Sequence, residues 1–194
     1  MSDLTPQKRW HAPAAATVAA LLMGLGACGD DPFSFRWDAS PDTVQLYSLA
    51  RPELNLQSGI SFVPPPSTSI VEQPNSTGGW DIALDTRGAE LVLLPPGALG
   101  ITSRARISAL GPVNFDDVVE APEDTLLYED DQPVSLSNGS VYIVRTNRRV
   151  GSFGSSCVYY AKLEPVTIDV TGGTLLLRFV ASPVCNSRDL VPPE

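Results

Sequence analysis

The sequence predicts an all-β protein, a mostly antiparallel sandwich or a partly open barrel with short helical turns. Three observations support this class. Apolar residues recur with a period of two along most segments, and Gly, Pro and Asn residues separate those segments. No long stretch shows the 3.6-residue period of an amphipathic helix. The segments are also rich in Val, Ile and Tyr, which favour strands.

The predicted strands follow one another along most of the chain. They lie at residues 43–49, 59–63, 80–85, 89–95, 103–110, 140–146, 157–163, 166–170 and 174–180. In the third segment, WDIALD, the alternation places Trp80, Ile82 and Leu84 on one face and Asp81, Ala83 and Asp85 on the other. Residues 33–37, FSFRW, fit either a first edge strand or a docked linker.

The last two strands form the clearest predicted hairpin. They flank Gly172-Gly173, which can supply positive φ at both central positions of a tight turn. Helix is expected only as single turns, one within residues 114–124 before Pro122 and another within residues 48–54 after Pro52.

The first thirty residues have the pattern of an export signal. Lys8 and Arg9 precede an apolar run, residues 14–25, which is shorter than the roughly 20 residues that a membrane span requires. The sequence Leu-Gly-Ala-Cys ending at Cys28 resembles the lipobox of bacterial lipoproteins. The resemblance implies cleavage after Ala27 and acylation of Cys28, and three acyl chains would anchor the protein stably. The alternative is an ordinary cleaved signal with a chance cysteine.

These features predict three regions: a lipoprotein signal peptide at residues 1–27, a tether at 28–41 and a single β domain at 42–194. Residues Gly29 and Asp30 after the anchor favour the outer membrane by the sorting rule of enteric bacteria. The chain has 13 basic and 22 acidic residues. Cleavage would remove Lys8, Arg9 and Asp3, leaving 11 basic and 21 acidic residues and a net charge of −10. Such an acidic protein is a poor candidate for nucleic-acid binding.

The remaining cysteines, Cys157 and Cys185, are expected to form a disulfide, as two thiols in an exported chain usually pair. The loop-entropy model gives such a bond roughly 3 to 4 kcal/mol. The alternative is a catalytic or metal-binding thiol, but that usually needs a basic partner. The one histidine, His11, lies in the signal segment. A histidine-dependent triad or metal site is therefore not expected, and we predict no catalytic residues, no metal site and no cofactor.

Two segments resemble the HmuY-like lipoproteins, a family of all-β haem-binding proteins. The first is GGWDIALD, residues 78–85, and the second comprises VYIVRTN and YYAKLEPVTIDVTGGTLLLRFV. The acidic stretch between them resembles the family's middle region, so the resemblance covers residues 78–181. It implies an all-β fold and an envelope location.

The matched residues also have a purely structural interpretation. Trp80 would anchor the core at the start of a strand. Tyr160 and Lys162 would share one strand face, with Ala161 on the other. Arg145 and Lys162 could pair with acidic residues on neighbouring strands.

The resemblance leaves the ligand unassigned. The family coordinates haem with two histidines, and the mature chain has none. Phenolate ligation by Tyr142, Tyr159 or Tyr160 is the remaining route to haem iron, although adjacent Tyr159 and Tyr160 would point to opposite faces of one strand. We therefore expect a ligand other than haem.

Three charged clusters complete the candidate sites. Asp116-Asp117 and residues 128–133, YEDDQP, could bind calcium, or could simply be solvated loops. Paired acids also permit glycosidase chemistry, given a suitable separation. Arg145, Arg148 and Arg149 form a basic cluster that could contact an anionic partner or a lipid headgroup, or form a solvated turn.

The sequence therefore predicts a lipid-anchored, non-catalytic envelope protein that binds a small ligand or another envelope protein. The alternatives are a structural or accessory lipoprotein and a carboxylate-based hydrolase.

Overall fold

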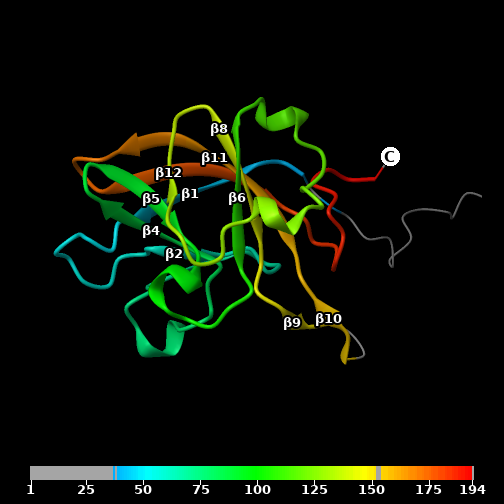
Figure 1. Cartoon of the computed structure of the whole chain (residues 1–194), viewed down its shortest axis with the longest axis horizontal. Coiled ribbons are helices and arrows are strands. Elements are labelled where there is room, and N and C mark those ends of the chain that lie inside the picture. Colours follow the sequence, from blue (N-terminus) through cyan, green and yellow to red (C-terminus); the bar gives the residue numbers. More distant parts are fainter. Residues whose placement is uncertain (1–36, 38, 152–153, 194) are drawn as a thin grey trace, which may run out of the picture. The chain divides into compact units, whose positions relative to one another are not determined.

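The computed structural model describes residues 37, 39–151 and 154–193, and Trp37–Glu194 forms one compact unit. Two five-stranded antiparallel sheets pack as a sandwich that is not closed into a barrel (Figure 1). The all-β prediction is therefore confirmed, and a sandwich rather than a partly open barrel is the architecture. Cys28 and residues 33–36 lie outside the described residues.

The first sheet has the strand order β1-β12-β11-β8-β6. Its strands are β1 (Asp42–Tyr47), β6 (Arg106–Pro112), β8 (Ser140–Arg145), β11 (Tyr160–Asp169) and β12 (Thr174–Ala181). Strand β11 joins two segments that the sequence predicted as separate strands. A register shift between Pro165 and Thr167 marks where they meet. Pro165 has no N–H to donate to the ladder, which accounts for the apparent break in the sequence.

The second sheet has the order β3-β2-β4-β5-β7. Its strands are β2 (Gly59–Ser61), β3 (Ser67–Ser69), β4 (Ile82–Arg87), β5 (Glu90–Leu94) and β7 (Val134–Ser135). A separate two-stranded pair consists of β9 (Arg149–Val150) and β10 (Ser156–Cys157). The sequence did not predict β3, β7 or β9 as separate strands, because two or three residues are too few to show a period.

The main core lies between the two sheets. Alternate residues of the long strands face inward and are almost fully buried, among them Leu84, Tyr142, Leu163 and Leu177. Phe62 and Phe179 meet edge to face with ring centroids 5.3 Å apart. This alternation is the physical origin of the two-residue period in the sequence.

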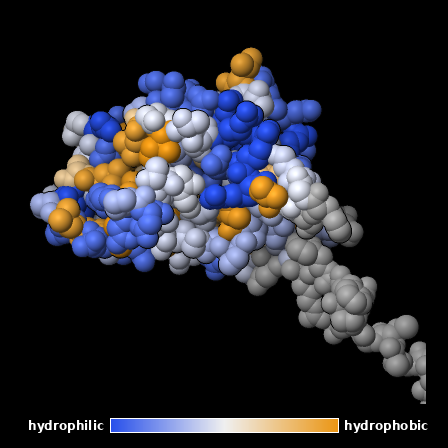
Figure 2. All heavy atoms as spheres, turned by 90° about the horizontal axis from the view of Figure 1, so that it is seen from below, coloured by the Kyte–Doolittle hydropathy of each residue, from blue (hydrophilic) through white to orange (hydrophobic). Residues whose placement is uncertain are grey.

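Both sheets are also covered on their outer faces. One outer layer consists of the loop segment from Phe115 to Tyr128 and the C-terminal Leu190, packed on Val141, Ile143 and Val180 of the first sheet. Trp37 and Ala39 of the predicted tether pack against the same layer. The other layer, on the second sheet, consists of Trp80, Ala83, Val92 and Leu94. On the face shown in Figure 2, hydrophobic residues form separate patches between hydrophilic ones.

The β11–β12 hairpin is confirmed, but its turn is longer than predicted. Asp169 pairs with Thr174 across the end of the ladder, so four residues form the loop. Of the two glycines, only Gly173 has positive φ, at +60°. The backbone N–H of Gly172 instead donates to the Asp169 carboxylate at 2.8 Å. The Asp169 side chain therefore takes part in closing this turn.

Helical structure is limited to short 3-10 turns: η2 (Pro74–Ser76), η3 (Pro96–Leu99), η4 (Phe115–Asp117) and η5 (Thr125–Leu127). The turn expected within residues 114–124 is η4, and the Asn114 side chain caps it. The prediction of a helical turn within residues 48–54 is wrong, since those residues form bends and non-helical turns. In the described part of the chain, no helix is long and apolar enough to span a membrane.

Candidate functional site

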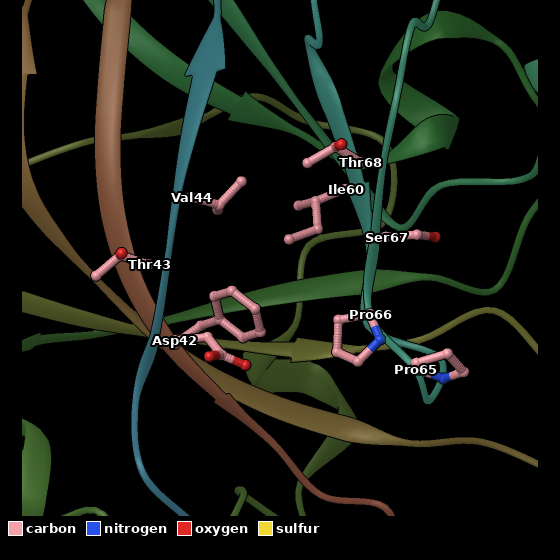
Figure 3. Close-up of a pocket in the computed structure, with 9 residues that line it drawn as sticks. Asp42, Thr43, Val44, Ile60, Pro65, Pro66, Ser67 and Thr68 are labelled. Carbon is pink, nitrogen blue, oxygen red and sulfur yellow. The ribbon is translucent and has the colours of Figure 1, made fainter.

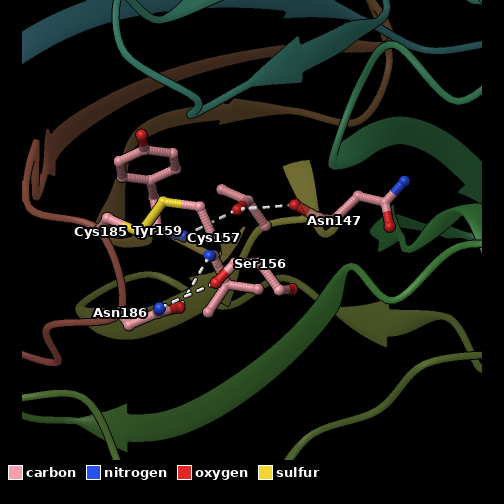
Figure 4. Close-up of a disulfide and its surroundings, with 8 residues drawn as sticks. Asn147, Ser156, Cys157, Tyr159, Cys185 and Asn186 are labelled. Carbon is pink, nitrogen blue, oxygen red and sulfur yellow. Dashed lines mark hydrogen bonds between the residues drawn. A yellow bond between two sulfur atoms is a disulfide. The ribbon is translucent and has the colours of Figure 1, made fainter. Parts of the chain in front are cut away.

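The predicted disulfide is confirmed. Cys157 at the end of β10 bonds to Cys185, with their Cα atoms 5.3 Å apart (Figure 4). Asn186 reinforces the link, because its side chain accepts from the Val158 N–H at 3.0 Å and donates to the Ser156 carbonyl at 2.9 Å. Both thiols are thus consumed in a structural cross-link, and neither is a free nucleophile.

We expect a Cys157→Ser/Cys185→Ser double variant to lose about 3 kcal/mol of unfolding free energy. The bond closes a loop with a sequence separation of 28 residues, and removing it frees that loop in the unfolded chain. Urea unfolding with and without dithiothreitol measures the effect. Reduction should shift the wild-type midpoint and leave the double variant unchanged, and an equal shift in both would contradict the prediction.

Trp80 and Asp81 directly precede strand β4 and are both fully buried. Trp80 is an apolar anchor, as predicted, but it lies in the outer layer rather than on the face of Ile82 and Leu84. The assignment of all three to one face is therefore wrong, because β4 begins only at Ile82 and the alternation does not extend back to Trp80.

The Asp81 carboxylate joins the two sheets. It accepts hydrogen bonds from the N–H of Phe62 at 2.8 Å and the hydroxyl of Ser61 at 3.1 Å, both in the second sheet or directly after it. Its other oxygen accepts from the N–H of Asn147 at 2.9 Å, just beyond β8 in the first sheet. Burial raises the pKa of Asp81, while these three bonds and nearby Arg149 oppose the rise. Asp81 therefore has a structural role, because it holds the chain after β2 and the chain after β8 at fixed positions.

Lys162 lies on β11 and is only 3% exposed. Its ammonium group donates to the carbonyl oxygens of Phe115 at 3.0 Å and Val118 at 2.9 Å, and lies 4.6 Å from the Phe115 ring centroid. Burial lowers the pKa of Lys162. The expected pairing of Lys162 with a strand carboxylate is wrong, since its partners are the carbonyls of a covering loop. Tyr160 shares its face, as predicted, while Ala161 faces the main core.

The acidic clusters are dispersed. Asp116 and Asp117 belong to η4, while Asp130 forms an ion pair with Arg106 at 2.9 Å. Glu129 extends the edge of β6 through a bridge to Ile107. No group of three potential metal-ligating side chains occurs among the described residues.

The tyrosines proposed for haem ligation have separate locations. The buried Tyr142 hydroxyl donates to the Ser135 carbonyl at 3.0 Å and accepts from the Ser137 N–H at 2.9 Å. Tyr159, directly before β11, and Tyr160, its first residue, are half-buried. None of the three lines either of the two recesses described below.

The first recess is a groove of about 570 Å³ between the sandwich edges, where β1 faces β3 (Figure 3). Val44 and Ile60 point toward each other across it, and Phe179 also lines it. The other lining residues are one carboxylate, three hydroxyl-bearing residues and two prolines: Asp42, Thr43, Ser67, Thr68, Pro65 and Pro66. Its mixed lining and its position between edge strands fit an extended segment of chain better than a compact solute.

The second recess, of about 400 Å³, is lined by Arg104, Arg106, Thr125 and Arg145, and we call it the arginine cleft. Arg106 on β6 and Arg145 on β8 are direct cross-strand partners. Arg145 donates from Nη1 to the Arg104 carbonyl at 3.2 Å, not to a carboxylate as expected. The pairing of these two strands brings together arginines that are far apart in the sequence.

The basic cluster predicted from Arg145, Arg148 and Arg149 is split by the structure. Arg145 belongs to the arginine cleft, whereas Arg149 donates to the Gly78 carbonyl at 3.3 Å. Arg148 is exposed. Sequence reasoning missed Arg104 and Arg106, although their i, i+2 spacing in a predicted strand places both side chains on one face.

In comparisons with known proteins, no family model and no curated protein sequence matches this chain.

Proposed function

We propose that this chain is a lipid-anchored binding protein of the cell envelope, held through Cys28 in the outer membrane. The observation that carries the binding role is the arginine cleft, in which polar groups from two strands and a turn converge on one recess. The lipobox-like sequence ending at Cys28 supports the anchor, and the resemblance to HmuY-like lipoproteins supports the location.

Replacing Cys28 with serine tests the anchor. With [3H]palmitate in the growth medium, the wild-type protein should carry label and remain with carbonate-washed membranes. The Cys28→Ser variant should lose the label and should no longer be processed as a lipoprotein. A variant that remains processed and membrane-bound would overturn the anchor.

The proposed ligand is a molecule other than haem. The two histidines that the HmuY-like family uses are absent from the proposed mature chain, and the Tyr142 hydroxyl already makes two hydrogen bonds within the core. Haem titrated into the purified protein should give only a weak, non-saturable change in the Soret band. A saturable shift at micromolar haem that a single Tyr→Phe change abolishes would restore haem binding.

A non-catalytic role is part of the same proposal. Among the described residues two carboxylates are buried, Asp81 and Asp85, and other groups engage both: three hydrogen-bond donors contact Asp81, and Arg87 pairs with Asp85 at 2.7 Å. Neither lines the groove or the arginine cleft. The pair therefore offers no support for a two-carboxylate hydrolase.

The second candidate is an accessory lipoprotein that acts through protein contacts. Strand β1 supports it, since this six-residue strand forms an edge of the first sheet beside the groove. A partner strand could add to that edge by main-chain hydrogen bonds. Replacing Val44 by proline should abolish capture of such a partner by crosslinking and leave ligand binding at the arginine cleft intact.

A further inference from the structure

The arginine cleft places like charges against each other. Arg106 and Arg145 are paired directly across the β6–β8 ladder, an arrangement that is destabilising for two cations. Arg104 lies two residues before Arg106 on the same edge of the sheet. Arg104, Arg106 and Arg145 line one recess together with the Thr125 residue of η5. A fold that needed only stability would gain by replacing one of the two paired arginines.

The cleft carries more positive charge than the carboxylates around it balance, although Arg148 and Arg149 outside the cleft also have no ion pair among the described residues. Carboxylates lie within ion-pair distance of Arg51, Arg87, Arg178 and Arg188. In the cleft, Asp130 pairs with Arg106, and the described residues offer no ion pair to Arg104 or Arg145. The Nε of Arg106 is buried without a hydrogen-bond partner. This deficit occurs in a chain with a net charge of −9, so carboxylates are abundant elsewhere.

The residues that line the cleft indicate which chemical groups it can bind. A guanidinium presents a planar fork of donors that matches carboxylate and phosphate oxygens, and it stays charged at every physiological pH. The Thr125 hydroxyl can add a further donor. The volume of about 400 Å³ falls in the range of small-molecule sites. The three arginines and Asp130 together leave a net charge of +2, which a solute with two negative charges would balance.

We propose that the arginine cleft binds a small solute with two or more negative charges carried by phosphate or carboxylate oxygens. Arg104 and Arg145 supply the uncompensated charge, and Arg106 is shared between the ligand and Asp130. This inference rests on the proposed binding function and names the ligand class of that same site.

Isothermal titration of the purified lipoprotein in detergent tests the proposal, with inorganic pyrophosphate and citrate as probes. At low salt at least one probe should bind saturably, and binding should weaken as salt screens the charges. Pyrophosphate alone would identify a phosphate ligand, and citrate alone a carboxylate ligand. Failure of both probes to bind would overturn the proposal.

Three variants assign the binding to the cleft. Arg104→Gln and Arg145→Gln should each weaken binding at least tenfold. Arg148→Gln removes the same charge from an exposed site outside the cleft, so it should change the affinity by less than twofold. Equal losses in all three would show a diffuse charge effect and overturn the assignment.

The Asp130→Asn variant should change the affinity in the opposite direction. It removes the internal competitor for Arg106, so affinity should rise several-fold, a result that misfolding does not produce. An unchanged or weaker affinity would contradict the shared role of Arg106.

Two further experiments distinguish a soluble ligand from a lipid headgroup, and failure of this inference from failure of the proposed anchor. Vesicles containing anionic lipid should bind the Arg145→Gln and wild-type proteins equally. If instead the wild-type protein binds neither soluble anion and Arg145→Gln binds vesicles more weakly than the wild type, the cleft contacts lipid headgroups. That result would overturn the proposal of a soluble ligand. Palmitate labelling at Cys28 is independent of the cleft, so a labelled protein that ignores both anions defeats the ligand class and leaves the anchor standing.

Discussion

The Asp81→Ala variant should have a free energy of unfolding about 4 to 6 kcal/mol lower than that of the wild type. This is the largest effect that we expect from a single side chain in this domain. The change leaves the Phe62 N–H, the Asn147 N–H and the Ser61 hydroxyl without their common acceptor. Each buried donor without a partner costs about 1–3 kcal/mol. Because these donors come from both sheets, the variant also loses a direct link across the sandwich. Urea unfolding followed by tryptophan fluorescence measures the loss.

Two controls make the Asp81 result specific. Asp85→Ala removes a carboxylate from the same strand, but that group pairs only with the half-exposed Arg87, so a loss of about 1 kcal/mol is expected. Asp81→Asn keeps an oxygen that can accept two of the three bonds, so its loss should fall between those two variants. If Asp81→Ala cost no more than Asp85→Ala, the cross-sheet role would be rejected.

The second large effect is expected from Lys162→Met, at about 4 kcal/mol. Methionine can fill the space of the aliphatic stem but cannot donate to the Phe115 and Val118 carbonyls, so two hydrogen bonds from a charged donor are lost, each worth about 1.5–3 kcal/mol. The Phe115 carbonyl would keep only the bond from the Val118 N–H at 3.4 Å. Arg178→Met is the matched control. Its guanidinium lies 4.4 Å from the Phe115 ring centroid but is half-exposed and pairs with Glu164, so about 1 kcal/mol is expected.

The pH dependence of the Lys162 variant has a definite sign. The pKa of Lys162 is lowered by burial in the folded protein, so the unfolded chain binds more protons between that pKa and 10.5. Unfolding free energy of the wild type relative to Lys162→Met should therefore rise as pH increases through this window, and stay constant below it. A relative stability that falls with alkaline pH would refute the lowered pKa.

The class of fold could be predicted because burial in a sandwich imposes a two-residue period directly on the chain. The prediction failed where local structure interrupts that period. At Trp80 the strand has not yet begun, so counting back from Ile82 assigns the wrong face. At residues 160–169 a proline within one strand gave the appearance of two.

The disulfide was predictable and the arginine cleft was not, for one physical reason. Cys157 and Cys185 are the two cysteines after Cys28, so their pairing requires no knowledge of the fold. The cleft depends on the register between β6 and β8, which places Arg106 opposite Arg145 across a sequence separation that no local pattern encodes. Neighbouring arginines in the sequence were grouped instead, and the structure separates them.

The apolar layers outside the two sheets imply that the domain does not open as one unit. The loop layer over the first sheet belongs to neither sheet and is fixed by side-chain packing, with Phe115, Tyr128 and Leu190 among its members, and by the Lys162 ammonium group. Segments of this kind can detach at a free-energy cost below that of global unfolding. Amides of residues 115–128 should therefore exchange with deuterium well before those of β11 and β12. Because Thr125 lies in this segment, such an opening would widen the arginine cleft while the arginine-bearing strands stay folded.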